Sequence, residues 1–126
     1  MTNFNNNSVF HLKPIAAAEI IPEVFNLLIP GESVVSAFKT LRDQLIFTSK
    51  RIIAVDVQGI GRKREFTSMP YNRVQYFSVQ TPGVMEMVPD SELTLVFTNG
   101  FMATFEFRGN VDIGAIGRMI SGFVLK

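Results

Sequence analysis

Two runs of β-branched and aromatic residues within positions 43–57 flank a short polar break, Thr48 to Arg51. Such runs favour strands, and the break between them favours a hairpin. Because side chains alternate along a strand, Leu45 and Phe47 are expected on one face and Ile46 on the other. The second run, 52–57, is also apolar on both sides. We therefore predict a hairpin that is covered on two faces, by a core and by some second surface.

The composition is that of one globular domain. The chain has 126 residues, of which 47% are hydrophobic and 18% charged, so a disordered chain is excluded. A net charge of +1 gives no electrostatic reason to expect a nucleic-acid partner. The absence of cysteine excludes disulfides, thiolate metal sites and cysteine nucleophiles. Since the first thirteen residues also lack the apolar segment of a secretory signal, we expect a cytoplasmic protein.

Three regions follow one another along the chain. Residues 1–13 are rich in asparagine and are expected to be a disordered tail. Residues 14–29 predict a helical arm in two pieces, with Pro22 in the first turn of the second piece. The remaining region, 30–126, predicts strands followed by one helix. Pro30-Gly31 separates the arm from this domain.

The domain contains one further hairpin with a clear signal. Leu93, Leu95 and Phe97 alternate with mostly polar neighbours, and the return strand alternates in the same way as far as Phe107. Asn99-Gly100 between them predicts a type I′ turn. We also expect strands at 33–41 and 73–80, an edge strand at 62–69, and a final helix. The helix is indicated by an apolar stripe at Ile113, Ile116, Ile120 and Phe123.

A set of short motifs occurs in order along residues 30–126: Pro30-Gly31-Glu32, Ala37-Phe38-Lys39, the run from Arg42 to Ile53, Asp56 to Gly59, Met69-Pro70-Tyr71 and Phe77-Ser78-Val79. With these motifs the chain resembles the bacterial pleckstrin-homology-like family, formerly a domain of unknown function. The resemblance implies a mainly β, α+β fold: a seven-stranded bent antiparallel barrel capped by a C-terminal helix. It also implies a homo-oligomer in the form of a closed cyclic ring, for which five subunits are expected.

The resemblance does not extend to phosphoinositide binding. Eukaryotic members that bind these lipids carry alternating Lys and Arg around the first inter-strand loop. Here that loop is Thr40 to Asp43, which is short and has its one cation beside an acid. The tryptophan typical of their closing helix is also missing, and Phe123 is the nearest substitute.

No constellation of catalytic or metal-binding residues is visible. His11 is the only histidine, and it lies in the tail with no partner for a triad or a metal. The acidic residues are scattered at turns, and no Gly-x-Ser-x-Gly motif occurs. We therefore expect no enzyme, no cofactor and no metal.

One basic cluster is a candidate for partner binding. If adjacent hairpins bring positions 50–51 and 62–64 together, five cations gather at one end of the sheet: Lys50, Arg51, Arg62, Lys63 and Arg64. Charge that protects a sheet edge from unwanted pairing explains them well. The alternative is an anionic partner, either a lipid surface or an acidic protein.

Apolar residues with no evident place in the core are candidates for contacts between subunits. They lie in the arm, in the segment after position 83 and on the outer face of the second hairpin: Val24, Leu27, Leu28, Met85, Met87, Val88, Val96 and Met102. The sequence thus favours a non-enzymatic scaffold, a ring that binds a further protein through its polar strand surface. The alternative is a peripheral membrane module that uses the five cations.

Overall fold

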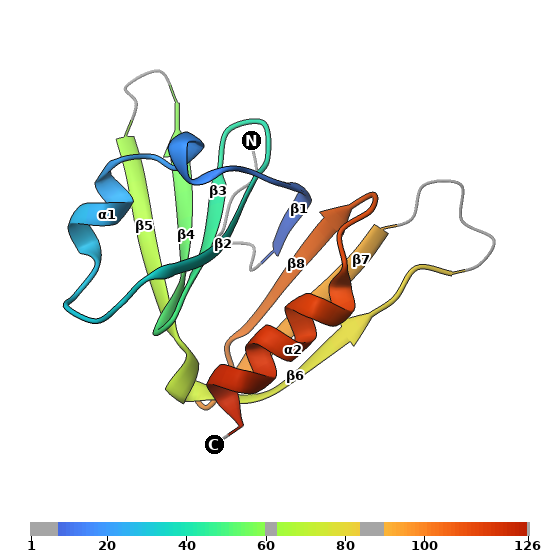
Figure 1. Ribbon diagram of the computed structural model, residues 1–126. Coiled ribbons are helices and arrows are strands. Elements are labelled where there is room, and N and C mark those ends of the chain that lie inside the picture. Colours follow the sequence, from blue (N-terminus) through green and yellow to red (C-terminus); the bar gives the residue numbers. More distant parts are fainter. Residues whose placement is uncertain (1–7, 60–62, 84–89, 126) are drawn as a thin grey trace.

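The computed structural model describes residues 8–59, 63–83 and 90–125. Its elements are β1 (Ser8–Pro14), η2 (Ala17–Glu19), α1 (Glu23–Leu27), β2 (Val34–Lys39), β3 (Gln44–Thr48), β4 (Arg51–Gln58), β5 (Lys63–Pro70), η3 (Tyr71–Arg73), β6 (Val74–Gln80), β7 (Asp90–Phe97), β8 (Met102–Arg108) and α2 (Ile113–Val124). Across these ranges the strands form one sheet in the order β5-β4-β3-β2-β1-β8-β7-β6 (Figure 1).

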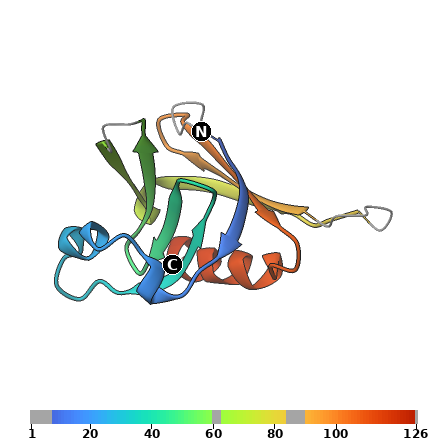
Figure 2. The same cartoon turned by 90° about the horizontal axis from the view of Figure 1, so that it is seen from above.

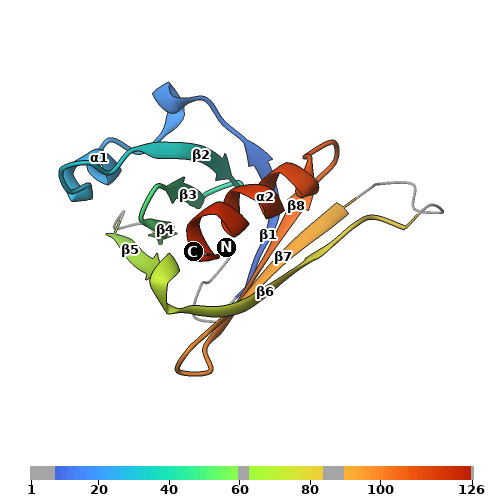
Figure 3. The same ribbon diagram turned by 60° about the horizontal axis from the view of Figure 1, so that its bottom comes forward.

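The sheet curls so that its two halves, β2–β5 and β6–β8, face one another across a shared interior (Figure 2). Helix α2 lies across one end of this curl (Figure 3). The predicted fold, a bent sheet with a C-terminal helix, is confirmed. Two details differ: the described residues form eight strands where seven were expected, and β1 pairs parallel with β8.

Strand β1 corrects the prediction of a disordered tail for residues 8–13; residues 1–7 lie outside the described part. Val9 and Leu12 are both buried in the main core. Their partners on β8, Phe105 and Phe107, are two residues apart, so β1 carries one extra residue there. His11 lies in this bulge with a φ of 62°. The apolar positions are therefore spaced by three, and a search for the strand period of two misses them.

The main core lies between the two half-sheets and α2. It takes alternate residues from the strands, including Phe47, Phe105 and Phe107, all of which are fully buried. Helix α2 contributes the predicted stripe, with Phe123 half-buried at its end. A Cβ on Gly117 would lie 3.3 Å from Val79 Cγ1, so this glycine permits the close approach of helix and sheet.

The predicted second surface is the N-terminal arm. Ile46, Ile53 and Val55 form a separate buried cluster on the outer face of the hairpin, where Ile20 and Val24 of the arm cover them. Gln44 at the start of β3 fixes the arm in place: its Nε2 donates to the Glu19 carbonyl, and its Oε1 accepts from the Ile21 N–H, both at 2.9 Å. The arm consists of two pieces, η2 and α1, as predicted.

The turn between β7 and β8 differs from the predicted type I′ turn. Among the described non-glycine residues only His11 has a positive φ, so Asn99 does not adopt the conformation that type I′ requires. The Phe97 N–H instead donates to the Phe101 carbonyl at 2.8 Å. Three residues close the loop, and Gly100, with a φ of 89°, supplies the left-handed position of a three-residue turn.

Candidate functional site

The five predicted cations do not gather at one end of the sheet. In the β4–β5 pair, Arg51 lies opposite Pro70 and Lys63 lies opposite Gln58. Arg51 and Gln58 are seven residues apart, which along a strand is about 23 Å at about 3.3 Å per residue. Consecutive antiparallel strands begin at opposite ends, and this separates Lys50-Arg51 from Lys63-Arg64. The expected cluster is therefore wrong in its geometry; Arg62 lies outside the described residues.

Arg51 holds the arm onto the sheet. Its Nε and Nη2 donate to the two carboxylate oxygens of Glu32 at 2.9 and 3.0 Å. It also donates to Ser68 Oγ at 3.0 Å and to the Leu27 carbonyl at 2.5 Å. The Glu32 side chain is fully buried and accepts a further bond from Thr48 Oγ1 at 2.5 Å. Every polar group of Arg51 thus has a structural role, and we name this network the Glu32–Arg51 clamp.

The pKa of Glu32 reflects this network. Burial alone raises the pKa, because it disfavours the charged carboxylate. The hydrogen bonds from Arg51 and Thr48, with one from the Ile29 N–H, outweigh burial and leave the pKa below its ordinary value. The carboxylate is therefore ionised where it meets the guanidinium.

The other described cations of the predicted cluster are exposed. Arg64 forms an ion pair with Glu23 of α1, and Lys50 and Lys63 have no ion pair among the described residues. With Arg51 committed to the clamp, no common surface of positive charge arises from these residues.

The predicted contacts between subunits differ in how far the structure exposes them. Val24 is fully buried in the cluster beneath the arm and offers no surface to another molecule, whereas Leu28 packs against that cluster and is partly buried. Leu27 and Met102 are exposed. Val96 is buried on the outer face, between its cross-strand neighbours Tyr76 and Met102. Met85, Met87 and Val88 lie outside the described residues.

Further apolar side chains, which were not predicted from the sequence, are exposed. Phe25 and Ile29 lie beside Leu27 in the arm, and Tyr76 lies beside Val96 on β6. The helical spacing of the arm singled out Val24 and Leu28, which face the sheet, and of the exposed residues only Leu27. Tyr76 follows a bulge between Val74 and Tyr76, so its face of the strand is not evident from the pattern.

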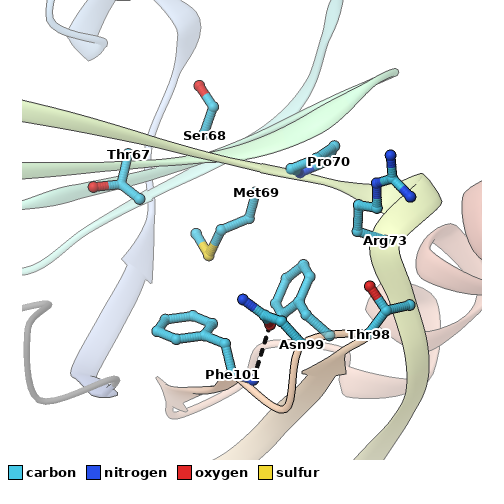
Figure 4. Close-up of a pocket in the computed structure, with 9 residues that line it drawn as sticks. Thr67, Ser68, Met69, Pro70, Arg73, Thr98, Asn99 and Phe101 are labelled. Atoms are coloured by element: carbon cyan, nitrogen blue, oxygen red, sulfur yellow. Dashed lines mark hydrogen bonds between the residues drawn. The ribbon is translucent and has the colours of Figure 1, made fainter.

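A hollow of about 460 Å³ lies between the edge of β5 and the turn that joins β7 to β8 (Figure 4). We name it the seam. Residues 67–70 of β5 form one wall, residues 97–99 and 101 form the opposite wall, and Arg73 lies at the junction. Its volume is within the range of about 300–1,000 Å³ that is usual for ligand pockets. No sequence signal links these two walls, because only the curl of the sheet brings them together.

A second, smaller hollow of about 310 Å³ is lined by four basic side chains, His11, Lys13, Lys39 and Arg108. Three of them face a carboxylate of this chain. His11 Nδ1 is 3.3 Å from Glu106, Lys39 is 3.1 Å from Glu19, and Arg108 is 3.9 Å from Asp90. The contact of His11 with Glu106 is an ion pair between β1 and β8, and it forms neither a triad nor a metal site. The carboxylates balance most of the positive charge of this hollow.

Neither a metal cluster nor a membrane-spanning helix emerges from residues 8–59, 63–83 and 90–125. Nowhere in these ranges do three His, Cys, Asp or Glu side chains converge as metal ligands would. The helices of the same ranges are too short or too polar to cross a bilayer.

The curled sheet with its closing helix defines a domain of the pleckstrin-homology type. A family model, described as Bacterial PH domain, matches residues 3–124. The chain belongs to the bacterial PH domain family. The match starts well before residue 30, the predicted beginning of the domain.

Two proteins of Bacillus subtilis (strain 168) are similar to this chain. It is 45% identical to the uncharacterized protein YjqA over 82 residues, which is 64% of this chain and 64% of the length of YjqA. It is 30% identical to the uncharacterized protein YozO over 95 residues, which is 75% of this chain and 81% of YozO.

Solved structures of pleckstrin-homology proteins share the fold. A DUF1696 family protein with a pleckstrin-homology domain from Shewanella loihica PV-4 is 28% identical, with a TM-score of 0.78 over 93% of this chain and 100% of that one. A pleckstrin homology domain from Shewanella amazonensis SB2B is 33% identical, with a TM-score of 0.63 over 83% of this chain and 85% of the other.

Proposed function

We propose that this chain is a non-enzymatic interaction module, which assembles head to tail into a closed ring of identical subunits and binds another protein through its polar strand surface. The observation that carries the proposal is the presence of exposed large apolar side chains on the arm and on the outer face of the β6–β8 half. Such patches on a soluble domain mark contacts with other molecules.

The first patch, the arm patch, consists of Phe25, Leu27 and Ile29, whose exposed fractions are 46%, 40% and 55%. They follow one another within five residues of α1 and the segment after it. The second, the outer-face patch, is the row Tyr76, Val96 and Met102 across β6, β7 and β8. Tyr76 is 59% exposed and Met102 48%, and together they flank the buried Val96.

The position of the two patches favours a head-to-tail contact. The arm covers the outer face of the β2–β5 half, whereas the outer-face patch belongs to the β6–β8 half (Figure 1). A two-fold dimer uses the same patch on both subunits, but two different patches combine when one subunit's arm meets the next subunit's outer face. Such contacts close into a ring when the rotation between subunits allows it.

The non-enzymatic part of the proposal has its own support. Among the described residues no three His, Cys, Asp or Glu side chains converge, and the residues that line the seam include no acid–base pair. A membrane role through the predicted cations lacks comparable support, since the β4–β5 pairing separates Arg51 from Lys63 by about 23 Å.

Native mass spectrometry together with light scattering at micromolar concentration tests the assembly. The wild-type chain is expected to form one closed oligomer, with five subunits as the expected count. Phe25→Ser/Ile29→Ser and Tyr76→Ser/Met102→Ser each remove one patch and are expected to give monomers. Leu41→Ser is the matched control, because Leu41 is fully exposed and belongs to neither patch.

Mixing the two patch variants separates a head-to-tail contact from a two-fold one. Each variant retains one intact patch, so the mixture is expected to form a heterodimer and nothing larger. A monomeric wild-type protein at micromolar concentration contradicts the proposed ring. A mixture that stays monomeric contradicts the pairing of these two patches.

A further inference from the structure

The seam follows the edge of β5. Thr67 to Pro70 are four consecutive residues, and all four line the hollow. Because side chains alternate between the two faces of a strand, a pocket over one face would touch only every second residue. Contact with all four means that the hollow runs along the backbone of β5.

Within the described ranges no strand lies beside this edge of β5. There β5 is the terminal strand of the sheet and pairs only with β4. Its outward backbone N–H and C=O groups therefore have no ladder partner, and such an edge accepts an added strand. The cations at positions 63 and 64 deter pairing at the start of β5, but Phe66 to Met69 carry no charge.

The seam also has an apolar floor. Met69, which is almost fully buried, points across the hollow toward Phe101 (Figure 4). The rings of Phe97 and Phe101 lie against one another, with centroids 5.8 Å apart. Asn99 Oδ1 accepts a hydrogen bond from the Phe101 N–H at 3.0 Å, which holds the turn in place. The floor thus fits one apolar side chain.

Arg73 is the only charged residue among those that line the seam. It is exposed, and no carboxylate of the described residues pairs with it. An unpaired guanidinium beside an apolar hollow complements a ligand that carries a carboxylate.

We propose that the seam binds an extended peptide segment of a partner protein as an additional strand on β5, with an apolar side chain between Met69, Phe97 and Phe101 and a carboxylate at Arg73. Backbone pairing supplies affinity, and the two side chains set specificity. The inference rests on the proposed role in protein interaction and names the chemistry of the partner. It does not depend on the ring, because neither patch of the ring contact lines the seam.

Selection from a displayed library of random heptapeptides against the full chain tests the inference. The selected sequences are expected to combine an aliphatic or aromatic residue with Asp or Glu nearby. The tightest of them, made as a free peptide, is measured by titration calorimetry. Arg73→Ser is expected to weaken it at least about tenfold, because a charge-assisted hydrogen bond is lost. Arg118→Ser is the matched control, since Arg118 is an exposed arginine outside the seam.

Two further measurements locate the peptide. Phe101→Ser, which alters the floor at a half-buried position, is expected to weaken binding by a similar factor. A copy of the peptide with alternate N-methylated amides retains its side chains but cannot pair with β5, and is expected not to bind. The inference is overturned if no peptide is enriched, if Arg73→Ser and Phe101→Ser bind as tightly as wild type, or if the N-methylated copy still binds. Peptide binding by a monomeric wild type would refute the ring and leave this inference standing.

Discussion

Replacement of Glu32 by glutamine is expected to destabilise the fold strongly. The carboxylate is buried and accepts bonds from Arg51, Thr48 and the Ile29 N–H. In the Glu32→Gln variant an NH2 group replaces one of the two carboxylate oxygens, so one N–H donor of Arg51 faces another donor and the negative charge is lost. Breaking a buried ion pair from one side costs about 3–5 kcal/mol. Because Arg51 retains its bonds to Ser68 and Leu27, we expect a loss near the lower end, about 3 kcal/mol.

Urea unfolding followed by far-UV circular dichroism measures this loss. With a slope of about 2 kcal/mol per molar urea, the midpoint falls by about 1.5 M and the slope stays the same. Protein concentration is held constant, since self-association adds to stability. Glu19→Gln is the control: it removes the exposed ion pair with Lys39, and its midpoint is expected to match wild type. If Glu32→Gln lowers the free energy of unfolding by less than about 1 kcal/mol, the reasoning is refuted, because exposed surface ion pairs contribute that little.

The pH dependence of the clamp has a definite sign. The folded pKa of Glu32 lies below its ordinary value of 4.5, which is the value expected of the unfolded chain. A depressed pKa contributes stability that is present above pH 4.5 and is lost as the pH falls through the folded pKa. The difference between wild type and Glu32→Gln is therefore complete at pH 7 and shrinks below about pH 4.5.

Three further predictions concern stability. Leu12→Ala, at a fully buried position of β1, is expected to lower the free energy of unfolding in urea by about 2–5 kcal/mol. If this segment were a disordered tail, the substitution would have no effect. Tyr71→Phe removes the 2.8 Å bond to the Thr48 carbonyl and is expected to cost about 1 kcal/mol. Since burial raises the pKa of Tyr71 above its ordinary value of 10, this contribution is present below pH 10 and declines above it. In thermal melts Gly122→Ala, which meets no neighbour, is expected to stabilise the protein by about 0.5–1 kcal/mol, and Gly117→Ala by less, because its Cβ would press on Val79.

Local patterns in the sequence were enough for much of the fold. The alternation of Leu45, Phe47 and Ile46 correctly predicted a hairpin with two covered faces, since burial of each face depends on side chains that the strand itself carries. The apolar stripe at Ile113, Ile116 and Ile120 likewise predicted α2 and the face that it buries. The edge position of β5 followed from its weak pattern and from Pro70.

The remaining features depend on contacts between distant residues. The bulge at His11 changes the apolar spacing of β1, so the strand becomes evident only beside β8. The role of Arg51 requires Glu32, which is 19 residues away and belongs to a loop. The seam requires the curl of the whole sheet, because its two walls are about thirty residues apart along the chain.

The central place of β1 has a consequence for folding during synthesis. Ser8 pairs with Thr104 and Leu12 with Phe107, so β8, one of the two partners of β1, is synthesised about 95 residues later. At about 5–20 residues per second the ribosome needs on the order of 5–20 s to supply that partner. The pairing of β1 with β8 joins the two half-sheets, so they cannot be joined in this way before β8 is made. Contacts between residues so far apart in the sequence form slowly. In a nascent chain halted before residue 102, the apolar side chains of Val9 and Leu12 would thus remain accessible to chaperones.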